Sequence, residues 1–196
     1  LESALKQLNQ GKDVVFQDNK AEEVLSTIGL LSLKPKIIVC NVDESSLETG
    51  NKFTQSVKSN YNNEKIITIC ADIEDQIMGL NNVEREVFMK EIGLKKTGLN
   101  KLIKEGYDLL NLNTFFTSGP EESRAWTIKK GSLAPEAAGT IHTDFQKGFI
   151  RAEAVSYEDF INNKGWVDSK SNGKMRLEGK EYIVKDGDIL NFRFNT

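Results

Sequence analysis

The segment Lys36-Ile-Ile-Val-Cys-Asn-Val-Asp-Glu44 decides how the first half of this 196-residue chain folds. It begins with a continuous apolar run, which is typical of a strand buried on both faces of a parallel sheet. A second run of the same kind is Lys65-Ile-Ile-Thr-Ile-Cys70. Between the two runs, apolar residues recur on one face of a predicted crossover helix, namely Phe53, Val57 and Tyr61. The order strand, helix, strand predicts an α/β unit.

Helical patterns flank this unit on both sides. Before it, the spacing of leucines predicts a helix over residues 1–10, and a second apolar stripe predicts another from Ala21 to Leu31, ending before Pro35. After it, helices are predicted at residues 73–80, 83–92 and 99–110. The first half of the chain therefore alternates strands and helices.

From Leu112 onward the pattern changes to short alternating or aromatic runs separated by turn signals. Strands are predicted at residues 112–117, 124–128, 149–155, 182–184 and 189–194, and short helices at residues 135–138 and 157–162. Ser156 is placed to cap the second of these helices. This arrangement predicts a small α+β module in which a mixed sheet packs on one helix.

Composition limits the classes of protein to consider. The chain is 38% hydrophobic and 28% charged, with a formal net charge of −3, so overall charge gives no reason to expect a polyanionic partner. Its two cysteines, Cys40 and Cys70, each close an apolar run, as buried free thiols do, which favours a reducing cytoplasmic setting. No apolar run approaches the roughly 18 residues of a membrane span, and no signal peptide opens the chain.

Polar residues follow both predicted buried strands. Asn41 offers a donor and an acceptor that can contact the edge of a purine, and the Glu44 carboxylate can accept from a ring or exocyclic N–H. Cys70-Ala71, at the end of the next strand, can present backbone amides to the same base. The alternative is that residues 41–44 form an ordinary polar loop and that Cys70-Ala71 is only the end of a strand.

The second half contains the only histidine and a group of basic residues. His142 has no set of partners for a catalytic triad or a metal site, so a structural or surface role is favoured. Lys129, Lys130, Lys147 and Arg151 are interleaved with Trp126, Phe145 and Phe149. Such a cluster can bind RNA phosphates and stack on a base, although a solvated sheet surface is the alternative.

The loop that wraps nucleotide phosphates is missing from the sequence. Its pattern, Gly-x-x-x-x-Gly-Lys-Ser/Thr, requires Ser or Thr after a Gly-Lys pair, and each Gly-Lys pair here is followed by Asp, Met or Glu. We therefore expect the 196 residues to be inactive in nucleoside triphosphate hydrolysis by themselves.

The whole chain resembles the carboxy-terminal half of the YchF / Obg-like ATPase family. In the second half, the resemblance rests on Phe115-Phe-Thr-Ser-Gly119, Arg124-Ala-Trp-Thr-Ile128, Ala134-Pro-Glu-Ala-Ala-Gly139, Ile141-His-Thr-Asp-Phe145, Lys147-Gly-Phe-Ile-Arg151, Tyr157-Glu-Asp-Phe160 and Tyr182-Ile-Val-Lys-Asp-Gly-Asp188. In the first half it rests on Leu33-Lys-Pro35, Asn41-Val-Asp-Glu44, Cys70-Ala71, Glu84-Arg85, Phe88-Met89, Gly98-Leu99-Asn100 and Gly106-Tyr107.

The resemblance implies a division into three parts. Residues 1–33 would end an inserted helical arm, residues 34–111 would be the second half of a P-loop NTPase domain of α/β fold, and residues 112–196 would form a ubiquitin-like β-grasp TGS domain of α+β class. The phosphate-binding loop, the Mg²⁺ ligands and the catalytic histidine of the family have no counterpart here and would precede Leu1. The predicted strands would then lack sheet neighbours unless that segment is present.

The resemblance also implies a function. The full-length protein would be a cytoplasmic ATPase, or alternatively a GTPase, that binds a nucleoside triphosphate with Mg²⁺ and also binds the ribosome or RNA, with a monomer favoured. Asn41, Val42, Glu44, Cys70 and Ala71 would contact the base, because Asn-x-x-Glu replaces the Asn-Lys-x-Asp of GTPases. The rival hypothesis is a non-catalytic adaptor in which a TGS domain binds RNA or protein. A TGS domain from another enzyme, such as a threonyl-tRNA synthetase, has no support before residue 112.

Overall fold

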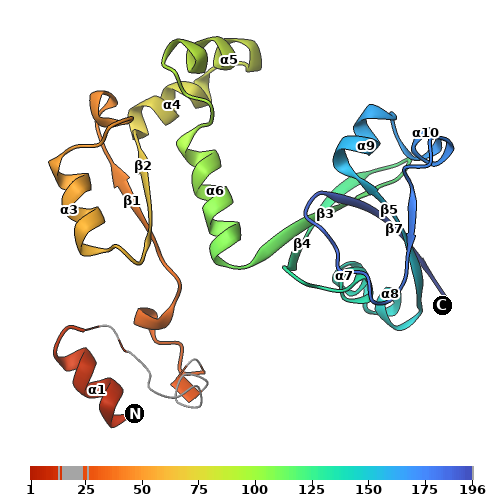
Figure 1. The fold of residues 1–196 in the computed structure, drawn as a ribbon, viewed down its shortest axis with the longest axis horizontal. Coiled ribbons are helices and arrows are strands. Elements are labelled where there is room, and N and C mark those ends of the chain that lie inside the picture. Colours follow the sequence, from red (N-terminus) through yellow and green to blue (C-terminus); the bar gives the residue numbers. More distant parts are fainter. Residues whose placement is uncertain (13, 15–23, 26, 196) are drawn as a thin grey trace. The chain divides into compact units, whose positions relative to one another are not determined.

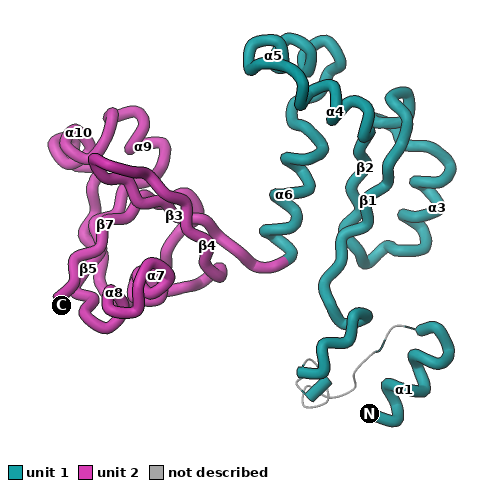
Figure 2. The backbone as a smooth tube through the Cα atoms, turned by 180° about the vertical axis from the view of Figure 1, so that it is seen from behind, with its two compact units in different colours: residues 1–109 teal, residues 110–196 magenta. Residues whose placement is uncertain are grey.

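The computed structural model describes residues 1–12, 14, 24–25 and 27–195. The chain divides into two compact units, Leu1–Leu109 and Leu110–Thr196 (Figure 2). Of the helix predicted between Ala21 and Leu31, residues 21–23 and 26 lie outside the described residues, and residues 27–29 form a turn. Among the helices that are described, none is long and apolar enough to cross a membrane.

Unit 1 begins with α1, Glu2–Asn9, which confirms the predicted first helix (Figure 1). Gly11 follows with a φ of 67°, a left-handed conformation that glycine adopts at no steric cost. Ala4 of α1, Val14 and Leu25 form a small apolar cluster, with Leu30 and Leu33 packed against it. The 3₁₀ turn η1, Leu31–Leu33, completes this region.

A parallel pair of strands forms the centre of unit 1. β1, Ile37–Asn41, pairs with β2, Lys65–Ile69, in a register that runs from Ile37 opposite Lys65 to Asn41 opposite Ile69. The crossover between them contains η2, Glu44–Ser46, and α3, Lys52–Asn60. The predicted strand, helix, strand unit is therefore confirmed.

The burial predicted for β1 is wrong. β1 was expected to be buried on both faces, yet Val39 is 40% exposed, because the described sheet contains two strands only. Phe53 of α3 and Tyr61, which follows its last residue, are also exposed, and the buried residue of α3 is Thr54, whose hydroxyl completes the capping box with Asn51. The local capping bonds set the start of α3, but the apolar stripe faces outward.

Three helices complete unit 1 and confirm the predicted ones. They are α4, Ala71–Gly79, α5, Asn82–Glu91, and α6, Gly98–Leu109. A cluster of Cys70, Ile73 and Ile77 holds α4 against α5, with Phe88 and Met89 packed on it. α6 lies against β2.

Unit 2 is built on a five-stranded mixed sheet in the order β4-β3-β7-β5-β6 (Figure 1). The strands are β3, Leu112–Ser118, β4, Ser123–Lys129, β5, Phe149–Ser156, β6, Arg176–Glu178, and β7, Asp188–Phe194. β3 and β7 run parallel, and the other neighbours are antiparallel.

One helix, α7, Ala134–Ile141, covers a face of this sheet. Ala134, Ala137 and Ala138 are fully buried, because small residues at helical spacing let the helix approach the strands closely. Phe115 and Leu190 lie beneath it, and a buried side chain of either type contributes about 2–3 kcal/mol. The predicted α+β module with a mixed sheet on one helix is confirmed.

Some predicted elements of unit 2 are incorrect. Residues 182–184 form an isolated bridge between Leu133 and Ile183 instead of a strand, and the strand β6 was not predicted. α8, Thr143–Lys147, and α10, Trp166–Ser171, were also missed, because each is too short to show a helical period. α9, Tyr157–Asn162, begins where predicted, with the Ser156 hydroxyl accepting from the Asp159 amide.

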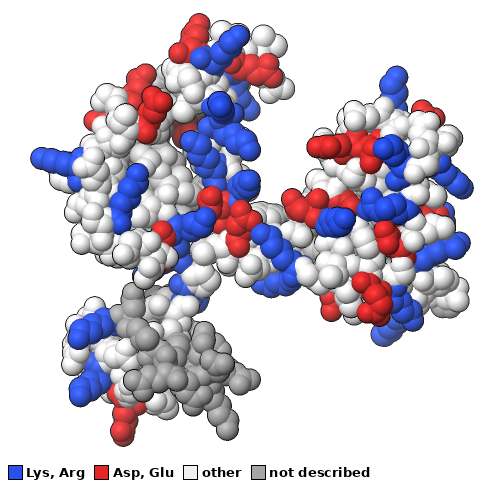
Figure 3. Space-filling model, in the orientation of Figure 1, with Lys and Arg blue, Asp and Glu red and all other residues white. Residues whose placement is uncertain are grey.

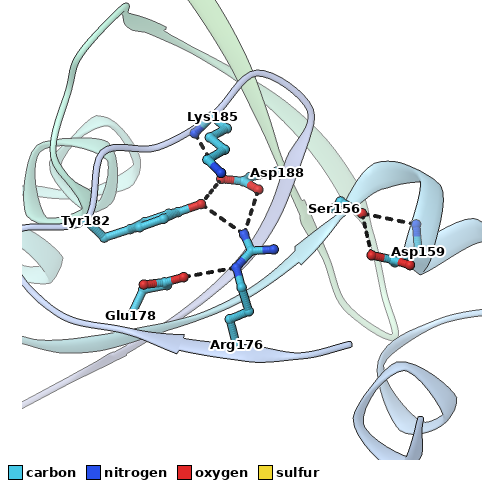
Figure 4. Close-up of polar contacts among 7 residues, drawn as sticks. All are labelled: Ser156, Asp159, Arg176, Glu178, Tyr182, Lys185 and Asp188. Atoms are coloured by element: carbon cyan, nitrogen blue, oxygen red, sulfur yellow. Dashed lines mark hydrogen bonds and ion pairs between the residues drawn. The ribbon is translucent and has the colours of Figure 1, made fainter. Parts of the chain in front are cut away.

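A buried carboxylate ties the end of the chain to the edge of the sheet (Figure 4). Asp188, which is 3% exposed, accepts hydrogen bonds from the Tyr182 hydroxyl at 2.7 Å, from the Lys185 amide at 2.9 Å and from the Arg176 guanidinium at 3.2 Å. The Arg176 Nε also donates to Glu178 at 3.0 Å. Each polar group near Asp188 therefore has a partner, as burial requires.

We predict that Asp188→Ala destabilises unit 2 by about 3 kcal/mol, because it removes the buried acceptor of three hydrogen bonds, from Arg176, Tyr182 and the Lys185 amide. Tyr182→Phe, which removes one hydrogen bond, should cost about 1 kcal/mol. Urea unfolding followed by tryptophan fluorescence reports on unit 2, since both tryptophans, Trp126 and Trp166, lie in it. An unchanged urea midpoint for Asp188→Ala would show that the network is not stabilising.

The same network predicts a loss of stability in alkali. Burial, and next the hydrogen bond to Asp188, raise the pKa of Tyr182 to about 12. An unfolded tyrosine loses its proton near pH 10, so the unfolded state binds fewer protons between about pH 10 and 12 and stability falls as the pH rises through that window. Urea midpoints measured against pH should fall more steeply there for the wild type than for Tyr182→Phe. Parallel curves would contradict the prediction.

Candidate functional site

The carboxyl ends of β1 and β2 bring together the two segments predicted to contact a base. The Asn41 side-chain Oδ1 accepts a hydrogen bond from the Ala71 backbone amide at 3.0 Å. Cys70 caps the start of α4, and the Val42 amide donates to the Ile69 carbonyl at 2.9 Å, which extends the pairing of the two strands by one residue. Asn41 therefore holds the second loop in place, and the structure gives its Nδ2 no partner among the described residues.

Asp43 and Glu44 have different roles in the loop after β1. The Asp43 carboxylate accepts from the Ser46 amide at 2.9 Å and from the Ser45 hydroxyl at 3.0 Å, so it caps η2. Hydrogen bonding from Ser46, and next from Ser45, lowers the pKa of Asp43. Glu44 is exposed and borders a cleft, which leaves its carboxylate available to a ligand.

This cleft, with a volume of about 870 Å³, lies between η2 and the segment that joins α5 to α6. Ile73 and Leu94 contribute to its apolar lining. Its charged lining consists of three lysines, Lys95, Lys96 and Lys101, and three glutamates, Glu44, Glu48 and Glu91. On the face shown in Figure 3, Lys and Arg side chains gather along α6. These lysines were not among the predicted site residues, although the Lys95-Lys96 doublet before the α6 pattern was a visible signal.

The start of α6 is joined to α4 by a second hydrogen-bonded link that the sequence did not suggest. The Glu74 carboxylate accepts from the amides of Gly98 at 2.5 Å and Leu99 at 3.2 Å. A side chain at Gly98 would come within 2.6 Å of Ile69, so glycine is required at this close approach. The Cys70-Ala71 loop is therefore held from both sides, by Asn41 and through α4 by α6.

Unit 2 separates the predicted basic cluster of Lys129, Lys130, Lys147 and Arg151. Lys129 lies opposite Leu112 at the start of β3, whereas Arg151 lies opposite Arg193 near the end of β7. Because β3 and β7 run parallel, these positions are at opposite ends of the sheet, roughly 20 Å or more apart. Lys147 ends α8, which leads into β5 with Arg151. The structure therefore divides the predicted cluster between the two ends of the sheet.

His142 lies at the junction of α7 and α8 and caps the shorter helix. Its Nδ1 accepts from the Asp144 amide at 3.2 Å, and its ring lies 6.2 Å from that of Phe145. The expected loop at this position is therefore a helix junction. Across the described residues, no group of three or more His, Cys, Asp and Glu side chains is arranged to hold a metal ion.

Comparison with known proteins identifies relatives over the full chain. The family model YchF-GTPase_C, described as a protein of unknown function (DUF933), matches residues 112–195. The ribosome-binding ATPase YchF of Escherichia coli O157:H7 is 48% identical over 100% of this chain and 55% of the relative. The protein of the same name from Bacillus subtilis (strain 168) is 43% identical over 100% of this chain and 54% of the relative.

Solved structures agree with the sequence comparison. The Schizosaccharomyces pombe YchF GTPase matches with a TM-score of 0.76 and 33% identity, over 91% of this chain and 48% of that protein. A GTP-binding protein from Pyrococcus horikoshii OT3 shares the fold, with a TM-score of 0.56 and 20% identity over 83% of this chain and 46% of that protein. The chain spans about half the length of these relatives. Its fold is that of a partial G domain followed by a TGS-like domain, and the whole chain is similar to the carboxy-terminal half of the YchF proteins.

Proposed function

We propose that this chain is the carboxy-terminal portion of a YchF-type P-loop ATPase, which in its full-length form binds and hydrolyses ATP and binds the ribosome. The observation that carries the nucleotide part is the hydrogen bond from the Ala71 amide to the Asn41 side chain. It joins two loops at the carboxyl ends of parallel strands, which is where open α/β sheets bind ligands. The name ribosome-binding ATPase, given to the bacterial relatives, supports the same assignment.

The proposed base recognition follows from the hydrogen-bonding groups that each side chain does not already use within the protein. The Oδ1 of Asn41 is occupied by Ala71, so its Nδ2 donates to a ring nitrogen acceptor of the purine. Glu44 accepts from a ring or exocyclic N–H, Val42 contributes an apolar surface, and Cys70-Ala71 forms the other side of the base site. The donor from Asn41 suits both purines. We therefore assign the preference for ATP over GTP to Glu44 at the fourth position of the motif.

Hydrolysis requires parts that this sequence does not contain. We place the phosphate-binding loop, the Mg²⁺ ligands and the catalytic histidine in the segment of the full-length protein that precedes residue 1. Residues 1–33 are assigned to the end of a helical arm, residues 34–111 to the second half of the nucleotide domain, and residues 112–196 to the TGS domain. Mg²⁺ would supply charge stabilisation at the phosphates, away from the base contacts made by this chain.

Ribosome binding is assigned to the TGS domain and the helical region of a cytoplasmic, monomeric protein. The net charge of −3 provides no general attraction to RNA, so contacts must come from local basic sites. Lys129 and Lys130 form one such site, and Lys147 with Arg151 forms the other. The alternative function is a non-catalytic adaptor, in which the TGS domain binds RNA or protein and residues 41–44 form only a loop.

Two substitutions at Asn41 test the nucleotide part in the full-length protein. Asn41→Ala removes both the acceptor for the Ala71 amide and the donor to the base, whereas Asn41→Asp keeps the acceptor and removes the donor. Both should weaken ATP binding about tenfold, the equivalent of one hydrogen bond. Titration with labelled ATP and GTP measures this.

Hydrogen exchange at the Ala71 amide is the matched control, because only Asn41→Ala should accelerate it. Wild-type affinity in Asn41→Asp would show that Nδ2 does not contact the base. Failure of the wild type to bind either nucleotide would leave the adaptor as the better assignment.

Cosedimentation with ribosomes over a salt series tests the second part. Binding should fall steeply with salt. Two double variants test the basic residues: Lys129→Glu with Lys130→Glu, and Lys147→Glu with Arg151→Glu. Each should lower the slope of the logarithm of the binding constant against the logarithm of the salt concentration by about one for each phosphate that is no longer neutralised. The exposed lysine Lys180 offers a charge-matched control as Lys180→Glu. Double variants that sediment like the wild type at every salt concentration would exclude these basic sites.

A further inference from the structure

The sheet of unit 2 has a groove of about 500 Å³ on the face opposite α7. Alternation along β7 explains its composition: Leu190 and Phe192 point into the core, so Asn191 and Arg193 point to the other face. The hairpin between β3 and β4 and the helix α10 form the walls, with Trp166, Val167 and Lys170 from α10. The groove therefore combines an aromatic ring, an aliphatic side chain, an amide and cations.

The indole of Trp166 is held rigidly in the wall of this groove. Its Nε1 donates to the Ser118 carbonyl at 2.9 Å, and its ring meets that of Phe160 edge to face at 5.3 Å. Beside it, the aliphatic side chain of Val167 is 78% exposed. An ordered aromatic ring next to an exposed apolar side chain offers a flat ligand a surface at little entropic cost.

The positive charge of the groove is also fixed in position. Glu153 accepts from the Arg193 guanidinium at 3.2 Å and from the Asn191 amide at 2.7 Å, so one carboxylate orients both side chains. Arg151 lies directly opposite Arg193 on the neighbouring strand and shares its face. Arg151 and Lys170 have no acidic partner among the residues that the structure describes. Lys170 and Arg193 line the groove together with one carboxylate, Glu153, and Arg151 adds a further positive charge beside it, so this surface is net positive.

We infer that this groove binds single-stranded RNA, with a base against Trp166 and Val167 and phosphates at Arg151, Arg193 and Lys170. Asn191 and Glu153 can donate to and accept from the edge of an unpaired base. A duplex hides both the face and the edge of its bases, so it cannot use these groups. The inference rests on the proposed ribosome binding, and it specifies the surface and the RNA element recognised.

Fluorescence anisotropy with a labelled single-stranded RNA of about eight nucleotides tests the inference on the full 196-residue chain. Lys170→Glu and Val167→Asp should each weaken binding about tenfold, because both side chains are exposed in the groove and neither supports the fold. In a Trp126→Phe background the RNA should quench the remaining emission of Trp166. Lys180 is exposed and lies outside the groove, so Lys180→Glu should bind the RNA as the wild type does.

Three results would overturn the inference: equal binding of a duplex of the same length, wild-type affinity in both groove variants, or no binding of the RNA at all. Ribosome cosedimentation separates these results from failure of the proposed function. Groove variants that still sediment with ribosomes, while the Lys129 and Lys130 double variant does not, would place the ribosome contact at the other basic site. Loss of sedimentation in the wild type would instead reject ribosome binding itself.

Discussion

The parallel pairing of β1 with β2 is the constraint on which the candidate nucleotide site depends. It places Asn41 opposite Ile69, so the residues that follow each strand emerge at the same edge. The Asn41 side chain then accepts from the Ala71 amide at 3.0 Å, and Glu74 at the other end of the loop accepts from the start of α6. The oxygen of this side-chain amide orders the neighbouring loop, and its nitrogen, without a partner among the described residues, is the donor proposed to contact a base.

Unit 2 is stabilised by an apolar core and by a buried carboxylate. Its sheet and α7 enclose a core whose central residues, Phe115 and Leu190, are almost fully buried. The connection from β6 to β7 has little regular structure, and the buried Asp188 supplies the acceptor that fixes it to Arg176 and Tyr182. An apolar core alone would not specify the path of this connection, whereas a buried carboxylate with three donors permits few arrangements.

The sequence predicted the features that depend on local pattern and could not predict those that depend on register. The strands at β1 and β2, the helix α7 and the cap at Ser156 follow from apolar period and capping chemistry. The separation of Lys129 from Arg151 does not, because residues 22 positions apart meet or diverge according to strand order. The groove at Trp166 was missed for the same reason: its residues come from β5, β7, α10 and the β3–β4 hairpin. Short elements such as β6 carry too few residues to show a period.

The two units also differ in how well their apolar patterns are satisfied. In unit 2 the alternating residues of β5 and β7 are buried as the pattern requires. In unit 1 the apolar side chains Val39, Phe53, Leu99 and Ile103 are between 40% and 68% exposed. A strand that is apolar on both faces is typical of the interior of a larger sheet, where it has a neighbouring strand on each edge. In the described part of unit 1, β1 and β2 each have one neighbouring strand. The relatives are about twice as long as this chain, so the family has further polypeptide that can cover such surfaces. Nucleotide affinity measured on the 196 residues therefore gives a lower limit for the base site alone, and the Asn41 variants are informative when they are made in the full-length protein.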